Sequence, residues 1–324
     1  MTTAYADPTR ALDHHPQPRQ SLLRTDLRVE HTVNTSDGVR LAVRDYQPTT
    51  AVQHTVVLLH GLCLTHTSWH NQIRRLHRQP GVRIIAYDHR GHGRSTTAPL
   101  RTYTIEQLAG DLADVLTDLA VTGPVTLAGH SMGGMCALAY LARANHPVAP
   151  AGLVLVATAA GDLSDHGLGR LLSTPGLDSL ADIVDHAPRH ATEHALRALA
   201  KPVCAALARH RGYDTADRTT LAAAVADALH KTPWTTAVGF LRALRNYDHY
   251  ATLPRITAAT TVISGGADIL TPATHARKLA DTIPNAHHIH RPKAGHMLLH
   301  EAARTVTDAI NRTTHAALSV ATGA

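Results

Sequence analysis

One serine lies in a short glycine-rich stretch, Thr126–Met135, which reads TLAGHSMGGM. An apolar run precedes this serine, Ser131, and helix-like sequence follows from Cys136. Gly129 and Gly133 flank Ser131 at two positions on each side, and glycine lets neighbouring backbone approach where a Cβ atom would clash. Ser and Gly are also ordinary turn residues. The pattern favours a sharp strand-to-helix turn that exposes the Ser131 hydroxyl as a nucleophile.

A serine hydroxyl is a weak nucleophile at neutral pH and must pass its proton to a base. His296, in the stretch AGHM, is the candidate base, because imidazole titrates near neutral pH. Asp268, in the stretch SGGAD, is the candidate for orienting His296 and stabilising its imidazolium form. Either residue alone indicates little, since the chain has 26 histidines and aspartate is common in turns. The chain order Ser131, Asp268, His296, each just past a predicted strand, predicts a catalytic triad.

Backbone amides are the candidates for stabilising the oxyanion that such a nucleophile creates. Leu62 follows an apolar run in the stretch HGL, and Met132 follows Ser131 directly. One oxyanion donor is typically worth about 3 kcal/mol of barrier. Cys63 and Trp234 are possible residues of the substrate pocket. The plainer interpretation of Cys63 is a small buried hydrophobe, and the pocket and packing interpretations of Trp234 stay open.

The elements around these residues follow the pattern of an α/β protein. Short continuous apolar runs, typical of strands buried on both faces, occur at 56–59, 82–87, 125–128, 153–156 and 261–264. We expect another short strand at 286–290, and an antiparallel hairpin formed by 27–33 and 39–46 around the turn Ser-Asp-Gly. The clearest intervening helix is amphipathic and covers 105–119.

This alternation predicts a mostly parallel, doubly wound sheet with helices on both faces. The carboxyl ends of parallel strands meet at one edge, where ligands bind in open α/β sheets. We therefore expect the three triad residues to gather at this edge.

The domain organisation follows from changes in composition along the chain. Residues 1–25 are polar and contain three prolines, so we expect a flexible N-terminal extension. Residues 26–160 and 251–324 form the two parts of the α/β core. Between them, residues 161–250 contain leucine- and alanine-rich helical patches and no obvious strand, which predicts an inserted helical cap over the carboxyl edge of the sheet.

Composition narrows the class of protein. The 324 residues are 44% hydrophobic and 3% aromatic, so the core must be mostly aliphatic. The net charge of +6 is scattered without a run of five like charges, which argues against nucleic-acid binding. Three cysteines without paired spacing favour a reducing compartment. Without a secretory signal or a stretch of 18 apolar residues, we expect a cytoplasmic protein with no membrane span. The histidine-dense places lack zinc-type spacing, so we expect no metal and no cofactor; the oligomeric state stays open.

Several of these stretches together resemble the α/β-hydrolase family, and the resemblance runs from about residue 27 to residue 313. Its carriers are HGL at 60–62, YDHRGHGRS at 87–95, GHSMG at 129–133, Gly265 with Asp268, and Gly295 with His296. The resemblance implies an α/β-hydrolase fold with residues 161–250 as the cap. It also implies a structural, rather than catalytic, role for residues 88–95 after the fourth strand. Serine at position 131 disfavours the epoxide-opening and dehalogenating members, which carry aspartate there, and the dienelactone-type members, which carry cysteine.

The expected function is that of a serine hydrolase. It would cleave a carboxylic ester, or a related lactone, thioester or amide bond of a small molecule, through an acyl-enzyme on Ser131. The same triad also allows C–C bond hydrolysis, perhydrolysis, and biosynthetic acyl transfer or cyclisation. A non-catalytic ligand-binding protein on this fold is a further alternative, because a fold does not dictate function.

Overall fold

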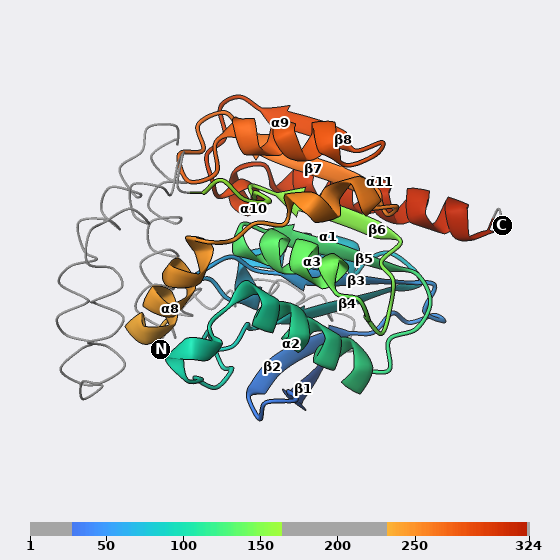
Figure 1. The fold of residues 1–324 in the computed structure, drawn as a ribbon. Coiled ribbons are helices and arrows are strands. Elements are labelled where there is room, and N and C mark those ends of the chain that lie inside the picture. Colours follow the sequence, from blue (N-terminus) through green and yellow to red (C-terminus); the bar gives the residue numbers. More distant parts are fainter. Residues whose placement is uncertain (1–27, 164–231, 323–324) are drawn as a thin grey trace, which may run out of the picture.

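A computed structural model describes residues 28–163 and 232–322 of the chain, which form a layered α/β structure around one eight-stranded sheet (Figure 1). The strands are β1 (Arg28–Asn34), β2 (Arg40–Tyr46), β3 (His54–Leu59), β4 (Val82–Tyr87), β5 (Val125–His130), β6 (Gly152–Val156), β7 (Ala259–Gly265) and β8 (His287–Arg291). Their order in the sheet is β1-β2-β4-β3-β5-β6-β7-β8. The pairings β1–β2 and β2–β4 are antiparallel, and all others are parallel. The fold class predicted from the sequence is therefore confirmed.

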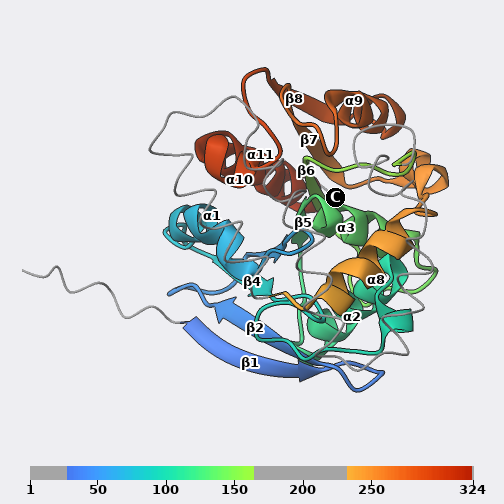
Figure 2. The same ribbon diagram turned by 90° about the vertical axis from the view of Figure 1, so that its left-hand side faces the viewer.

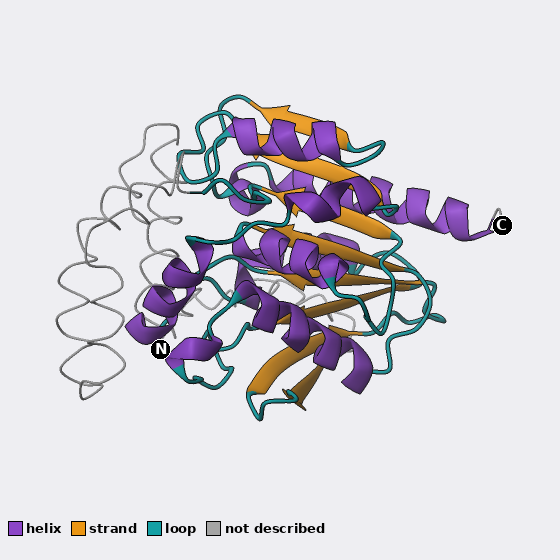
Figure 3. Cartoon of the chain, viewed as in Figure 1, coloured by secondary structure: helices purple, strands orange, loops and turns teal. Residues whose placement is uncertain are grey.

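Helices cover both faces of the sheet (Figure 3). The α-helices are α1 (His70–Leu76), α2 (Ile105–Asp118), α3 (Met132–Ala142), α8 (Trp234–Leu244), α9 (Ala273–Thr282), α10 (Leu298–Glu301) and α11 (Ala303–Thr322), and the 3-10 helices are η1 (His66–Trp69), η2 (Leu100–Thr102) and η3 (Tyr250–Arg255). Helices α2 and α3 pack on one face, and α1, α10 and α11 pack on the other. Figure 2 shows α8 beside α2. No helix in the described part of the chain combines the length and hydropathy that crossing a membrane requires.

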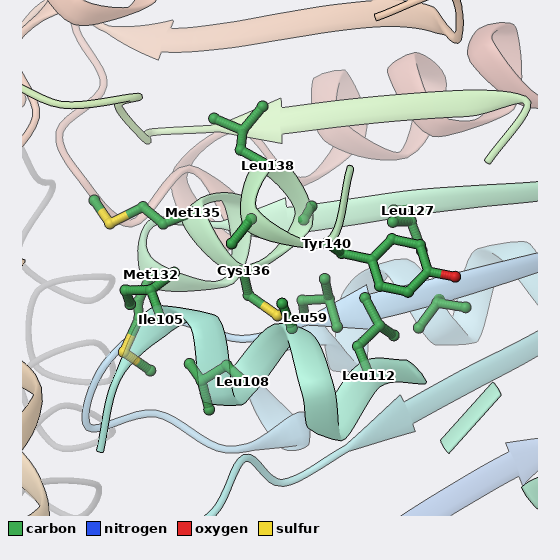
Figure 4. Close-up of a cluster of buried hydrophobic side chains, with 14 of the residues drawn as sticks. Leu59, Ile105, Leu108, Leu112, Leu127, Met132, Met135, Cys136, Leu138 and Tyr140 are labelled. Atoms are coloured by element: carbon green, nitrogen blue, oxygen red, sulfur yellow. The ribbon is translucent and has the colours of Figure 1, made fainter. Parts of the chain in front are cut away.

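The core between the sheet and helices α2 and α3 is built mainly from aliphatic and sulfur-containing side chains, with a few buried aromatic rings such as Tyr140 (Figure 4). Leu108 and Leu112 of α2 lie against Cys136 of α3, and all three are fully buried. The apolar stripe predicted over residues 105–119 therefore faces the core. The helix begins where the Thr104 hydroxyl accepts a hydrogen bond from the Gln107 N–H at 3.1 Å, an N-cap contact.

The strand predictions agree with the structure to within a few residues. The predicted hairpin corresponds to β1 and β2, and each of the five apolar runs lies in a strand. Strand β8 begins and ends one residue later than expected. Strand β5 continues past the expected end at Ala128 to His130, so it reaches Ser131 directly. The short helix α10 and the long helix α11 have no counterpart among the sequence predictions.

The expected N-terminal extension, residues 1–25, lies outside the described residues, as do residues 164–231 of the expected cap. Helix α8 is the described helix of that cap. At the base of the insertion, the His249 N–H donates a hydrogen bond to the Ala160 carbonyl at 2.7 Å. Lys278 of α9 pairs with Asp162 at 2.5 Å and lies 3.7 Å from the centre of the Tyr250 ring. The residues that follow β6 therefore lie in contact with the residues that precede β7.

Candidate active site

Ser131 lies in a sharp turn between β5 and α3. Its φ of +52° and ψ of −121° fall in a region that residues with a Cβ atom rarely adopt. The Ser131 N–H donates to the Val156 carbonyl at 2.9 Å, and the Thr158 hydroxyl donates to the Ser131 carbonyl at 2.8 Å. Such backbone strain costs about 1–3 kcal/mol and persists only where the surrounding structure holds it. The neighbouring strand β6 and the residues after it provide that support.

The two glycines around Ser131 are required by close backbone contacts. A Cβ atom on Gly133 would collide with the carbonyl oxygens of Leu59 and His60, and one on Gly129 would collide with the backbone of Gly133. The start of α3 therefore lies directly against the end of β3. This packing explains the Gly-x-Ser-x-Gly pattern and brings the chain after β3 next to the serine.

Asp268 and His296 form a direct hydrogen bond, in which Nδ1 of His296 lies 2.9 Å from Oδ2 of Asp268. The Asp268 side chain is fully buried, and that of His296 is 15% exposed. The Thr271 hydroxyl donates to Oδ2 of Asp268 at 2.8 Å, and the Leu270 and Thr271 N–H groups donate to Oδ1 at 2.9 and 3.0 Å. Burial alone would raise the pKa of Asp268, but His296 and these donors hold it below its ordinary value. The carboxylate is thus fixed in its charged form beside the imidazole.

The structure brings the predicted triad to one edge of the sheet, because Ser131, Asp268 and His296 follow β5, β7 and β8 respectively. His130, directly before the serine, donates from Nε2 to the His296 carbonyl at 2.9 Å. The rings of His130 and His296 lie 5.0 Å apart between centres. The serine and histidine segments are therefore in direct contact.

The segment after β3 lies beside the serine, where an oxyanion hole is expected. A Cβ atom placed on Gly61 would lie 3.2 Å from Cβ of Ser131. Leu62 follows, and Cys63 has a left-handed φ of +57°. Met132 is the first residue of α3, and the first N–H groups of a helix have no intrahelical acceptor and favour negative charge. Leu62 and Met132 thus lie on two segments that touch, and their assignment as oxyanion donors stays a prediction.

Two buried histidines support the Leu62 segment. Nδ1 of His60 donates to the Gly61 carbonyl at 2.8 Å, and its Nε2 accepts from the His89 N–H at 2.9 Å. Nδ1 of His92 donates to the Arg90 carbonyl at 3.0 Å, and its Nε2 accepts from the Cys63 N–H at 3.1 Å. One donor and one acceptor per ring fit the neutral form. Burial lowers the pKa of His60 to about 4 and that of His92 to about 3.

The stretch after β4, residues 88–95, is held by its own polar contacts. Asp88 accepts hydrogen bonds from both the backbone N–H and Nδ1 of His66, each at 2.8 Å. The buried Arg90 donates to Asp111 of α2 at 2.7 Å and to Asp37 of the hairpin turn at 2.9 Å. These contacts join the hairpin, α2 and η1 to the chain beside the oxyanion segment. Their geometry fits the structural role that the resemblance implied.

The two suggested pocket residues lie near this edge in different settings. Cys63 is half-buried, and its N–H is bonded to His92. Trp234 is half-buried at the first residue of α8, the helix that packs against η2 and α2. Neither placement tests contact with a substrate, so both assignments stay predictions. Cys204 lies outside the described residues.

Sequence reasoning did not identify Thr271, His60 and His92 as supporting residues, nor Glu301, whose carboxylate accepts hydrogen bonds from the Gly295 and Met297 N–H groups. Thr271 follows Asp268 by three residues, a spacing at which a side chain can bond to its own turn. His60 and His92 lie next to glycine after the neighbouring strands β3 and β4. This placement was the signal in the sequence that could have indicated a role near the site. The dense histidines of β8 have another role, because His288 and His290 each lie 2.9 Å from the Ser264 hydroxyl.

The chain belongs to the α/β-hydrolase fold family, since the family's sequence model matches residues 54–303. It is 38% identical over 114 residues to a non-heme chloroperoxidase of Streptomyces lividans, covering 35% of this chain and 40% of that protein. It is 37% identical over 123 residues to a bifunctional esterase/perhydrolase of Acinetobacter calcoaceticus, covering 38% and 43%. The chain thus spans less than half the length of these two relatives. A putative carbamate hydrolase of Variovorax paradoxus matches more fully, at 31% identity over 78% of this chain and 86% of that protein.

Solved structures support the same fold. An esterase of Exiguobacterium antarcticum superposes with a TM-score of 0.71 at 20% identity, covering 89% of this chain and 100% of that one. A bromoperoxidase of Bacillus anthracis superposes with a TM-score of 0.68 at 21% identity, covering 88% and 99%. At these identities the likeness establishes the fold, and the chemistry of this chain must be inferred from its own residues.

Proposed function

We propose that this protein is a serine hydrolase that cleaves a carboxylic ester, or a related lactone, thioester or amide bond, of a small molecule. The observation that carries the proposal is the 2.9 Å hydrogen bond between His296 and a buried Asp268, at the edge of the sheet that also presents Ser131 in a strained turn. A turn residue with no catalytic role would not require this combination of backbone strain and a neighbouring Asp–His hydrogen bond.

The reaction follows from the roles of these groups. The Ser131 oxygen attacks the substrate carbonyl while Nε2 of His296 takes its proton, and Asp268 stabilises the imidazolium that results. The amides of Leu62 and Met132 donate to the oxyanion of the tetrahedral intermediate. The intermediate collapses as His296 returns the proton to the leaving alcohol, thiol or amine, which leaves an acyl-enzyme. Water then attacks this ester by the same route, and the acid and free Ser131 are released.

Two of the relatives described above support acyl chemistry. They are proteins described as an esterase/perhydrolase and a putative carbamate hydrolase.

The chloroperoxidase and perhydrolase names also favour a second candidate function, in which hydrogen peroxide replaces water as the attacking species. The acyl-enzyme would then release a peracid. Product analysis in acetate buffer with hydrogen peroxide tests this activity, and an absence of peracid would exclude it.

Labelling with a fluorophosphonate, followed by mass mapping of the adduct, tests the nucleophile. We expect one adduct, on Ser131, together with turnover of p-nitrophenyl esters. Ser131→Ala should lose both, whereas the matched control Ser36→Ala, in an exposed turn, should retain both. Labelling without ester turnover would favour the C–C hydrolase or acyl-transfer alternatives. A wild-type protein that is not labelled would overturn the proposal in favour of a ligand-binding protein.

We further propose that Cys63 and Trp234 line the acyl pocket. Trp234 is the first residue of a described helix that lies over α2, and Cys63 adjoins the oxyanion segment. A series of p-nitrophenyl esters from acetate to decanoate should show a changed chain-length preference in Trp234→Ala. An unchanged preference would place Trp234 outside the pocket. The cytoplasmic location expected from the sequence stays a prediction.

A further inference from the structure

The carboxylate of Glu301 binds the backbone on both sides of His296. Glu301 is the last residue of the short helix α10, and its side chain reaches back past the start of that helix. Its Oε2 accepts from the Gly295 N–H at 2.5 Å, and its Oε1 accepts from the Met297 N–H at 2.9 Å. Hydrogen bonds from an N–H group to a charged carboxylate are stronger than those to a neutral acceptor. Both oxygens are thus used to fix one short loop.

The same loop is also held by contacts to β5 and to the loop of Asp268. The His296 carbonyl accepts the hydrogen bond from Nε2 of the buried His130. The Ala267 N–H donates to the Ala294 carbonyl at 2.9 Å, which joins the histidine loop to the loop of Asp268. The N–H groups of the residues before and after His296 and its own carbonyl therefore all have fixed partners. The backbone position of His296 is determined independently of its ring.

We propose that Glu301 is a positioning residue for catalysis, which holds the His296 loop so that the imidazole meets Asp268 and Ser131 together. This inference rests on the proposed function, because it assigns Glu301 a role through His296. The ring of His296 has one strong partner, Asp268, and must also reach the serine. A displaced loop would misplace the imidazole relative to Ser131, and displacements of about 1 Å can reduce rates by about 100-fold.

Replacing Glu301 by glutamine tests the proposal with little change in volume. Glutamine offers one acceptor, and its amide N–H₂ would face a backbone N–H, so one of the two loop contacts must break. We expect kcat for p-nitrophenyl acetate, and the rate of fluorophosphonate labelling of Ser131, to fall by about 10- to 100-fold. We expect KM to change little. The matched control Asp308→Asn, which removes one exposed charge from α11, should retain wild-type values.

The pH profile separates positioning from a general loss of structure. The titratable groups around the His296 loop are Asp268 from the loop after β7, His130 from β5, and Glu301 from α10, and His300 of α10 interacts electrostatically with His130. Loss of the Glu301 charge disfavours a cationic imidazole nearby, so the acid limb of kcat/KM should move to lower pH in Glu301→Gln. Glu301→Asp keeps the charge with a shorter reach, so its kcat should fall while its acid limb stays in place.

The outcomes distinguish failure of this inference from failure of the proposed function. Wild-type protein that neither is labelled nor turns over esters would overturn the proposed function itself. Active wild-type protein with a Glu301→Gln variant of equal kcat, labelling rate and pH profile would overturn the positioning role alone. Thermal unfolding of each variant is measured in parallel. If Glu301→Gln does not fold, the folded Glu301→Asp decides, and an unchanged kcat in that variant counts against the proposal.

Discussion

Nε2 of His92 accepts a hydrogen bond from the N–H of Cys63 at 3.1 Å, and this contact links the stretch after β4 to the segment after β3. Cys63 directly follows Leu62, whose amide is the proposed oxyanion donor. The left-handed φ of Cys63, +57°, turns the chain at this point, and a buried neutral histidine holds the turn. His92, in the Arg-Gly-His-Gly stretch, therefore supports the proposed oxyanion donor Leu62 through the backbone amide of Cys63.

Substitution of His92 by leucine should therefore weaken oxyanion stabilisation without removing the nucleophile. The Cys63 N–H would lose its acceptor, and the Leu62 amide would lose its fixed direction. Loss of a complete oxyanion donor costs about 10²- to 10³-fold in kcat, so we expect a fall of about tenfold or more. His92→Gln, which restores an acceptor, should recover part of this loss, and the exposed His287→Gln is the control. Equal kcat in His92→Leu and wild type would show that the contact has no catalytic consequence.

Asp268→Asn should disturb the orientation of His296 while leaving the fold intact. The amide would still accept from the Leu270 and Thr271 N–H groups, so the loop should remain in place. Its N–H₂ group cannot stabilise an imidazolium and favours the wrong tautomer, and losses of this kind reach about 10⁴-fold in kcat. Single-turnover acylation of the purified variant measures the effect, with the exposed Asp118→Asn as control. A loss below about tenfold would remove Asp268 from the triad.

Gly133→Ala should destabilise the protein as well as inactivate it. The added Cβ would collide with the backbone of Leu59 and His60, which cannot rotate away as a side chain can. Overpacking of this kind costs about 1–3 kcal/mol. Gly110→Ala in helix α2 is the matched control, because its Cβ would meet only side-chain atoms, of Gln107 at 3.5 Å and of Arg143 at 3.7 Å. In urea unfolding, the free energy of unfolding of Gly110→Ala should equal that of the wild type or exceed it by up to about 0.5–1 kcal/mol. The free energy of unfolding of Gly133→Ala should be lower than that of the wild type.

Acid should weaken the attachment of the hairpin turn to the core. The hydrogen bond from Arg90 is the main cause that lowers the pKa of Asp37 from 3.8 to about 2. A carboxyl whose pKa is lower in the folded state contributes stability above its unfolded pKa, and this contribution is lost as pH falls through the folded value. Thermal unfolding temperatures should therefore decline between about pH 4 and pH 2. The decline should be shallower in Asp37→Asn, and parallel curves for the two proteins would contradict the assignment.

The sequence was sufficient to predict the sheet, because buried strands depend on local signals, and it placed the candidate site residues just after those strands. Because runs such as 56–59 and 153–156 contain no polar residue, neither face of the strand that they form can be exposed to solvent. Ser131 and Asp268 each follow one of the predicted apolar runs, and His296 follows the more polar predicted strand at 286–290. The order of the parallel strands then brings them to one edge, and the structure shows the Asp268–His296 contact.

The supporting contacts could not be predicted in the same way, because they join distant parts of the chain through backbone groups. Every residue except proline carries an N–H and a carbonyl, so no residue type identifies Gly295 or Met297 as a partner of Glu301. His92 and His130 are two among 26 histidines, and only their burial and partners distinguish them. The ends of β5 and β8 were misplaced by one or two residues for a related reason, since strand ends are set by pairing with neighbours.

The pairing of β6 with β7 joins residues on opposite sides of the 164–231 segment, in register from Gly152 opposite Ala259 to Val156 opposite Ile263. The contact between His249 and Ala160 joins the two ends of the expected insertion, residues 161–250. Length and sequence between these points can therefore change without shifting the strand that leads to Asp268. In evolution or in engineering, exchange of the insertion is therefore expected to leave the proposed triad on its supporting strands, so that the proposed chemistry and the choice of substrate can change separately.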